Sequence, residues 1–165
     1  MTLAVEKKRN HKKLGFDHIE AAEMIVKLDQ LLINLDSFNK KLQQFHWTVI
    51  GPDFFELHDA FESLYKKTDE HIDEVAERIR VFGHYPTSDF SNPNRTSSIL
   101  IPEKGLSSEF MMREVVQDIE TLLGFLIEVA NAASNNGDVG TVTLMGNYLL
   151  FYEKMHWQYR SWLRK

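Results

Sequence analysis

From Asp17 to Val49 the chain contains neither Pro nor Gly, and its large apolar residues recur at alternating steps of four and three. That period places them in one stripe along one face of a helix. The stripe consists of Met24, Leu28, Leu31, Leu35, Phe38, Leu42, Phe45 and Val49. We therefore expect a long amphipathic helix that begins at Asp17, whose side chain is placed to cap the first amides.

Three further apolar stripes follow, and turn-forming residues separate them. A glycine, or Gly next to Pro or Asn, closes a helix, whereas Pro-Asp, Ser and Asp suit the start of one. The first helix should end at Gly51, and the second should run from Pro52-Asp53 to Gly83. The third should run from Ser107 or Ser108 to Asn135-Asn136-Gly137, and the fourth should begin at Asp138. Strand signals are weak throughout.

Residues 83–107 lack regular periodicity and are rich in Pro, Asn and Ser, so they read as a long crossover. We expect one short helix within it, around residues 96–100. The fold class is therefore all-α, a four-helix bundle with a long crossover between helices 2 and 3, which is the ferritin-like connectivity. A chain of 165 residues with 43% hydrophobic residues suffices for one such domain.

Composition limits the chemistry that the chain offers. It has no cysteine, which excludes disulfides, thiolate metal sites and thiol catalysis. Any bound metal is then held by nitrogen and oxygen ligands, which favours iron, manganese or zinc. The sequence shows neither a signal peptide nor an apolar run long enough to span a membrane. We expect a cytoplasmic protein without a membrane partner.

The first 16 residues are basic, whereas the rest of the chain is acidic. Residues 1–16 carry a net charge of +4 and the remainder −9, for a total of −5. We expect a flexible basic arm at 1–16 followed by the bundle domain at 17–165. The arm either binds DNA phosphates without sequence preference or serves as a disordered, solubilising tail. Its basic residues are Lys7, Lys8, Arg9, Lys12 and Lys13.

Five residues of metal-binding type lie between positions 46 and 77, namely His46, His58, Glu62, Asp73 and Glu77. On a helical wheel the last four fall at about 0°, 40°, 60° and 100°, so they share one side of the second helix. They form two pairs with i, i+4 spacing, which lets two side chains reach one ion. The pair centres, however, lie about 22 Å apart along the axis, so one chain cannot close a single site.

A second, antiparallel copy of the helix, related by a two-fold axis near residues 66–68, brings the first pair opposite the second. Because such a contact repeats every pairing, each dimer would hold two equivalent sites. The alternative interpretation of these four residues is an ordinary solvated helix face. We assign His71 and His156 structural roles, because His71 points away from the ligand side and His156 lies on an apolar stripe.

Residues 41–80 read KLQQFHWTVIGPDFFELHDAFESLYKKTDEHIDEVAERIR. This stretch closely resembles the Dps family, DNA-binding proteins from starved cells, in its FHW, GP turn, FF, LH and later D-E-x-A-E-R. The resemblance extends more loosely along the whole chain. It includes Gly137-Asp138, Glu153-Lys154 and Trp157.

The resemblance implies a hollow homo-dodecamer of four-helix subunits that oxidises Fe(II), usually with hydrogen peroxide, and stores ferric mineral. It implies ferroxidase centres at two-fold interfaces, with His46, His58 and Glu62 from one subunit and Asp73 and Glu77 from the other. The alternative is a nucleoid-binding shell that protects DNA and has vestigial metal chemistry.

Two positions depart from the family pattern. The family more often has Asp where this chain has Glu62, which changes the reach of that carboxylate. Many members also have Asp where Thr143 stands, and there it forms an acidic pore together with the residue that corresponds to Asp138. Only Asp138 of these two acidic residues is present here, so the sequence does not identify the route by which iron enters. Trp47, next to His46, is either an electron donor to peroxide-derived oxidants, as the family suggests, or a packed aromatic near an interface.

Overall fold

Four long helices make up most of the computed structural model, which describes residues 18–87 and 96–164. They are α1 (His18–Thr48), α2 (Phe54–Val81), α3 (Ser108–Asn135) and α4 (Val139–Trp162). No strand occurs among these residues, so the predicted all-α four-helix bundle is confirmed. The basic arm and the predicted helix start at Asp17 lie outside the described residues.

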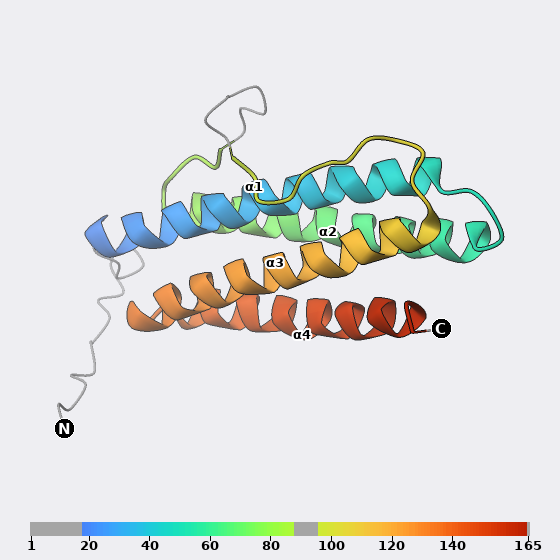
Figure 1. Ribbon diagram of the computed structural model, residues 1–165. Helices are drawn as coiled ribbons and strands as arrows, with labels where there is room; N and C mark the ends of the chain where they lie inside the picture. The colour runs from blue at the N-terminus through green and yellow to red at the C-terminus, as the bar shows by residue number, and fades with distance from the viewer. Residues whose placement is uncertain (1–17, 88–95, 165) are drawn as a thin grey trace.

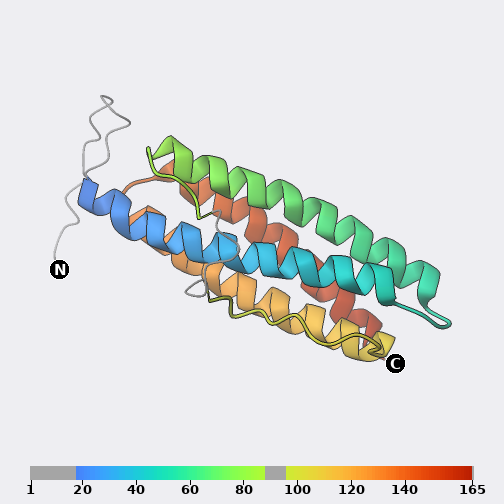
Figure 2. The ribbon, with the colours of Figure 1, turned by 90° about the horizontal axis from the view of Figure 1, so that it is seen from above.

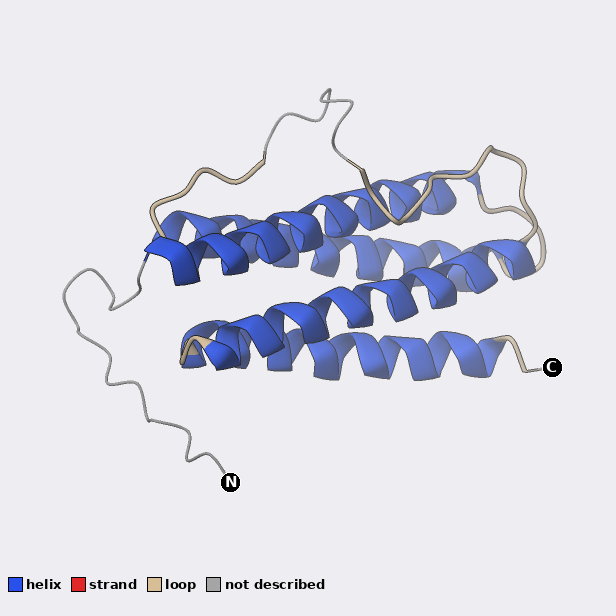
Figure 3. Cartoon of the chain, turned by 60° about the vertical axis from the view of Figure 1, so that its left-hand side comes forward, coloured by secondary structure: helices blue, strands red, loops and turns tan. Residues whose placement is uncertain are grey.

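The helices pack as two antiparallel pairs. α1 lies against α2 and α3 against α4, while α1 also contacts α3 and so joins the two layers (Figures 1 and 2). The end of α2 and the start of α3 lie at opposite ends of the bundle, so the connection between them has to span its length (Figure 3). The turn between α1 and α2, the start of α3 and the end of α4 therefore share one end of the bundle (Figure 1).

The apolar stripes form the core. All eight residues of the first predicted stripe are buried, and none exposes more than 2% of its surface. Helix starts follow the predicted signals, since the side chains of Ser107 and Asp138 accept hydrogen bonds from the amides of Phe110 and Thr141. Asp53 stands at the N-cap position of α2, although its side chain makes no capping bond.

The crossover is held on α1 by side chains, and this corrects one expectation. The predicted short helix at 96–100 is absent; residues 96–100 are irregular instead. The amide of Ser98 donates to the buried Asn34 Oδ1 at 2.9 Å, and Gln30 Nε2 donates to the Thr96 carbonyl at 3.1 Å. These backbone groups bind α1 in place of the i to i−4 partners that a helix would give them.

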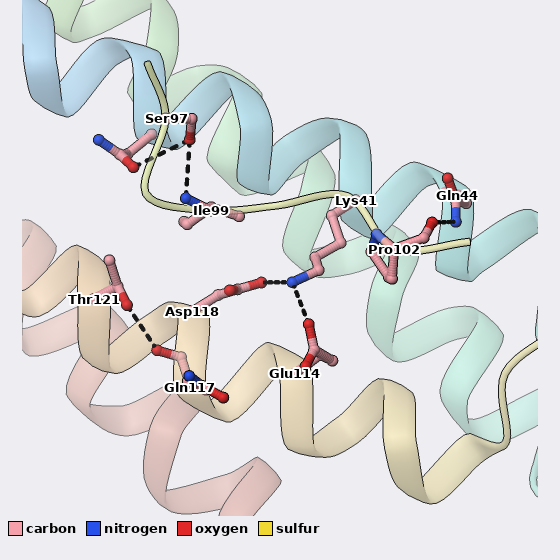
Figure 4. A network of polar contacts seen from close by, with 10 residues as sticks. Lys41, Gln44, Ser97, Ile99, Pro102, Glu114, Gln117, Asp118 and Thr121 are labelled. Atoms are coloured by element: carbon pink, nitrogen blue, oxygen red, sulfur yellow. Dashed lines mark hydrogen bonds and ion pairs between the residues drawn. The ribbon is translucent and has the colours of Figure 1, made fainter. Parts of the chain in front are cut away.

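A buried ionic network links α1 to α3 under the crossover (Figure 4). Lys41, whose side chain is 1% exposed, places Nζ 2.7 Å from Glu114 Oε2 and 2.7 Å from Asp118 Oδ2. Nearby, Gln44 Nε2 donates to the Pro102 carbonyl at 2.8 Å. Lys41 thus joins α1 to α3 through two charged hydrogen bonds at a buried position.

None of the helices in the described ranges is both long and apolar enough to cross a membrane.

Candidate metal site

His46 and His58 meet where α1 turns into α2. His46 lies in the last turn of α1 and His58 lies early in α2. Their rings stack with centroids 3.8 Å apart and an interplanar angle of 25°. Two residues separated by twelve positions in sequence are therefore brought into direct contact by the short turn at Gly51, whose φ of 104° suits glycine.

Each histidine is bonded to the main chain of the other. His46 Nδ1 lies 2.9 Å from the His58 carbonyl oxygen, and His58 Nδ1 lies 2.9 Å from the His46 carbonyl oxygen. Because a carbonyl only accepts, both Nδ1 atoms carry the proton. In the neutral imidazole this leaves both Nε2 lone pairs unprotonated, the state in which histidine binds metal ions.

The local sequence explains why these bonds form. The last carbonyls of a helix have no helical donor, and the His46 carbonyl belongs to this group. Aromatic rings wall the pair on two sides, since Phe54 stacks on His58 with centroids 4.9 Å apart and Tyr65 meets His46 edge-on at 5.5 Å. The His46 side is accordingly nearly buried, at 9% exposure.

Glu62 stands one helical turn beyond His58. Its Oε1 lies 2.5 Å from Lys66 Nζ, and about a third of the side chain is exposed. The hydrogen bond and charge of Lys66 hold the pKa of the Glu62 carboxyl below its usual value, and the two histidines contribute less in the same direction. Glu62 is thus ionised near the imidazole pair.

Asp73 and Glu77 lie near the other end of α2. The helix is continuous from Phe54 to Val81, so the axial separation of about 22 Å between the two pairs follows directly. Both side chains are exposed and have no hydrogen bond or ion pair with any described residue. Within the described part of one chain, no three His, Asp or Glu side chains are grouped closely enough to hold a metal ion.

His71 has a structural role, as the sequence predicted. His71 is 2% exposed and its Nδ1 lies 3.1 Å from the Tyr152 hydroxyl. Burial, followed by the charge of Lys67, lowers the pKa of His71 to about 4, so it is neutral at pH 7.

Asp138 is fully buried, and its Oδ1 accepts a 2.7 Å bond from Arg78 Nη2. The carboxylate also binds the Thr141 hydroxyl. Asp138 is therefore committed to the start of α4 within the subunit.

Two features of this region were not anticipated from the sequence. The reciprocal histidine bonds depend on the close approach of two helix ends, for which no residue pattern exists. The pairing of Glu62 with Lys66 did have a signal, because Glu followed by Lys at i+4 is the favourable order on a helix.

Comparison with known proteins places the chain among helical relatives over nearly its full length. The family model for the ferritin-like domain of the Ferritin family matches residues 26–165. DNA protection during starvation protein 2 of Bacillus anthracis is 37% identical over 125 residues, which cover 76% of this chain and 86% of that protein.

Two crystal structures agree with the fold. The Dps protein of Vibrio cholerae, described as a member of a broad superfamily of ferritin-like diiron-carboxylate proteins, has a TM-score of 0.87 at 29% identity and covers 97% of this chain and 99% of its own. Dps of Staphylococcus aureus has a TM-score of 0.82 at 32% identity, covering 86% and 95%. The chain therefore belongs to the Dps family of ferritin-like proteins.

Proposed function

We propose that this protein is an iron-storage ferroxidase whose centres are shared between two subunits. The reciprocal bonding of His46 and His58 carries the proposal, because it leaves an unprotonated Nε2 on each of two neutral imidazole rings that stack against one another. Glu62 adds an ionised carboxylate to that half of the site. Asp73 and Glu77, exposed and without partners in the described chain, supply the other half from a second copy.

The surroundings of the histidine pair favour a contact with that second copy. Trp47, Ile50 and Phe55 expose 73%, 76% and 80% of their surface near the turn between α1 and α2. Large apolar side chains gathered at one place are typical of a surface that a partner covers. A second copy that covers them, with its α2 antiparallel to this one, would bring the partner's α2 close to the imidazoles and would exclude water from the site.

The ligand set suits the oxidation of ferrous iron. Fe(II) accepts mixed imidazole and carboxylate ligands, and carboxylates stabilise the Fe(III) product with negative charge and hard oxygen donors. Two Fe(II) ions bound at one centre each give one electron. Together with two protons these electrons reduce one hydrogen peroxide to two water molecules, so iron and peroxide are consumed together and no hydroxyl radical is released.

Assembly into a hollow homo-dodecamer would enclose the ferric product. Protection of DNA would follow from the removal of iron and peroxide, and it is consistent with the name of the Bacillus anthracis relative. A second candidate function is a DNA-binding shell with weak ferroxidase activity. The net charge of +4 on residues 1–16 favours some contact with DNA phosphates.

Coexpression of two inactive variants tests the shared centre. His58→Ala and Asp73→Ala should each oxidise Fe(II) slowly when expressed alone. When they are coexpressed in equal amounts, random pairing restores about one quarter of the centres, because each mixed pair holds one intact site. Stopped-flow measurement of Fe(III) formation with peroxide, and separately with dioxygen, reports the recovery and the preferred oxidant.

A matched pair controls for general effects of coexpression. His58→Ala with Glu62→Ala affects the same half of the site in both chains, so no pairing restores an intact centre. The proposal is supported if the rate of Fe(II) oxidation recovers in the mixture of His58→Ala with Asp73→Ala and does not recover in the mixture of His58→Ala with Glu62→Ala. Equal rates in the two mixtures, or wild-type rates in the single variants, would remove the site assignment.

A further inference from the structure

The carboxylate of Glu62 is already paired with an ammonium group. Lys66 Nζ lies 2.5 Å from Glu62 Oε1, and among the described residues it is the only side chain that forms an ion pair with that carboxylate. The two residues stand one turn apart on the same side of α2. A cation bound by Glu62 would therefore meet a positive charge that is attached to the same helix.

The carboxylates proposed for the site are unequal in this respect. The Lys66 hydrogen bond and charge dominate the lowering of the Glu62 pKa, ahead of the influence of His46 and His58. Asp73 and Glu77 have no ammonium or guanidinium bonded to them among the described residues. Of the three, only Glu62 must give up such a contact before it can bind a metal ion with both oxygens.

Side-chain length contributes to the pairing. Glu followed by Lys at i+4 is the order in which the two side chains meet most favourably on a helix. An aspartate at position 62 would hold its carboxylate about one bond length closer to the backbone, farther from the Lys66 ammonium. The longer side chain at position 62 and the lysine at position 66 thus act together.

We propose that Lys66 competes with the metal ion for Glu62 and lowers the affinity of the iron position that Glu62 serves. This inference rests on the proposed function, because it takes Glu62 as a ligand. The position bound by Glu62 fills only at a higher Fe(II) concentration, after its carboxylate has exchanged the ammonium for the ion.

Titration of the assembled protein with Co(II) measures the competition directly. Co(II) stays unoxidised in buffer without peroxide, so the titration reports binding alone. Lys66→Gln should raise the affinity of the weaker position about two- to five-fold, the range expected for loss of an exposed ion pair. Lys67→Gln is the matched control, since its partner Glu70, at 2.5 Å, is not a ligand. That control should leave Co(II) binding unchanged.

A double-mutant cycle tests whether the two positions act together. Glu62→Asp in the wild-type background should raise the Co(II) affinity, because the carboxylate moves away from the ammonium. In the Lys66→Gln background the same change should give no gain. Circular dichroism and particle size, measured on each variant, establish that the fold and assembly are retained.

The possible failures separate the two proposals. If wild-type protein binds Co(II) in a manner that His58→Ala abolishes, yet Lys66→Gln binds it with wild-type affinity, competition by Lys66 is refuted and the shared site stands. Equal gains from Lys66→Gln and Lys67→Gln would also refute it, because the effect would then reflect net charge. Co(II) binding that ignores His58→Ala would overturn the site itself.

Discussion

Lys41 Nζ on α1 and Asp118 Oδ2 on α3 form an ion pair at 2.7 Å in the interior, with side-chain exposures of 1% and 9%. Glu114 completes the group from the rim, where 28% of its side chain is exposed. Buried ion pairs often contribute little net stability, since desolvation offsets their attraction. Removing one partner is different, because the remaining charge is then buried without compensation.

Lys41→Met should therefore destabilise the protein by about 3 kcal/mol, the lower part of the range for breaking a buried pair, since Glu114 keeps access to solvent. Unfolding in guanidinium chloride at fixed protein concentration measures the change. The control is Lys40→Met, at the neighbouring exposed position, which should alter the free energy of unfolding by less than about 0.5 kcal/mol. Equal effects at the two positions would contradict the role assigned to the network.

The same network predicts a pH dependence. Burial raises the pKa of Asp118 to about 6, although the hydrogen bond and charge of Lys41 partly oppose the shift. A carboxyl that holds its proton more tightly in the folded state contributes stability that is complete below its unfolded pKa. That contribution is lost as the pH rises through about 6.

Asp118→Asn removes this titration. The free energy of unfolding of the wild type, minus that of the variant, should fall between pH 4 and pH 7 and then level off. Urea unfolding at several pH values gives this difference, in which the titration of most other groups cancels. A difference that rises over the same interval would show that Asp118 is ionised more readily in the folded protein, contrary to the burial argument.

Asp138 should show the opposite pH dependence. Burial opposes its ionisation, but the bonds from Thr141 and Arg78 outweigh burial and hold the pKa of this carboxyl below its usual value. Its stabilising contribution is therefore present above the unfolded pKa and is lost as the pH falls through the lower folded value.

Replacement of Asp138 separates its two roles. Asp138→Ala removes both the cap and the partner of Arg78, at a cost of about 2 to 3 kcal/mol at pH 7. Asp138→Asn keeps an oxygen that accepts from the Thr141 amide, and it should cost about half as much. Thermal unfolding of both variants measures the order, and a larger loss for Asn than for Ala would exclude the capping role.

Deletion of residues 1–13 tests the basic arm. Retardation of DNA in a gel should be lost or greatly weakened, since the deletion removes all five basic residues, while the rate of Fe(II) oxidation should stay unchanged. In the intact protein, retardation should decrease as the salt concentration rises. Retardation that survives the deletion would assign DNA binding to another surface.

The mass of the particle tests assembly. Twelve copies of the 19.3 kDa chain give a shell of about 230 kDa, which light scattering after size exclusion distinguishes from a dimer or monomer. A dimer of stable mass that still oxidises iron would keep the shared centre and remove the shell.

The helices were predictable because apolar periodicity and capping residues are visible in the local sequence. The stripe from Met24 to Val49 is buried throughout, and Ser107 and Asp138 cap the helices that they were expected to open. The placement of His58 with Glu62 and of Asp73 with Glu77 on one helix was predictable for the same reason, since i, i+4 spacing needs no knowledge of the rest of the fold; their role as metal ligands stays a prediction. Their assignment to a shared centre remains a prediction.

What the sequence did not reveal depends on partners that are distant along the chain. Lys41 meets Asp118 across 77 positions, and nothing near either residue indicates the other. A short helix was expected at residues 96–100, but the Thr96 carbonyl and the Ser98 amide bind side chains of α1 instead, and these partners are present only in the packed bundle. Hydrogen bonds between residues far apart in the sequence thus determine the structure at the positions where prediction from local sequence was wrong or silent.

The reciprocal hydrogen bonds of His46 and His58 also bear on the rate at which the proposed centre would bind an ion. Both imidazole rings are already held in one orientation before an ion binds, so binding does not cost further side-chain entropy at these two residues. A rigid, preset imidazole pair favours rapid uptake and a hairpin that keeps its shape whether loaded or empty. In the proposed ferroxidase centre, such a pair would return to the same geometry after each turnover.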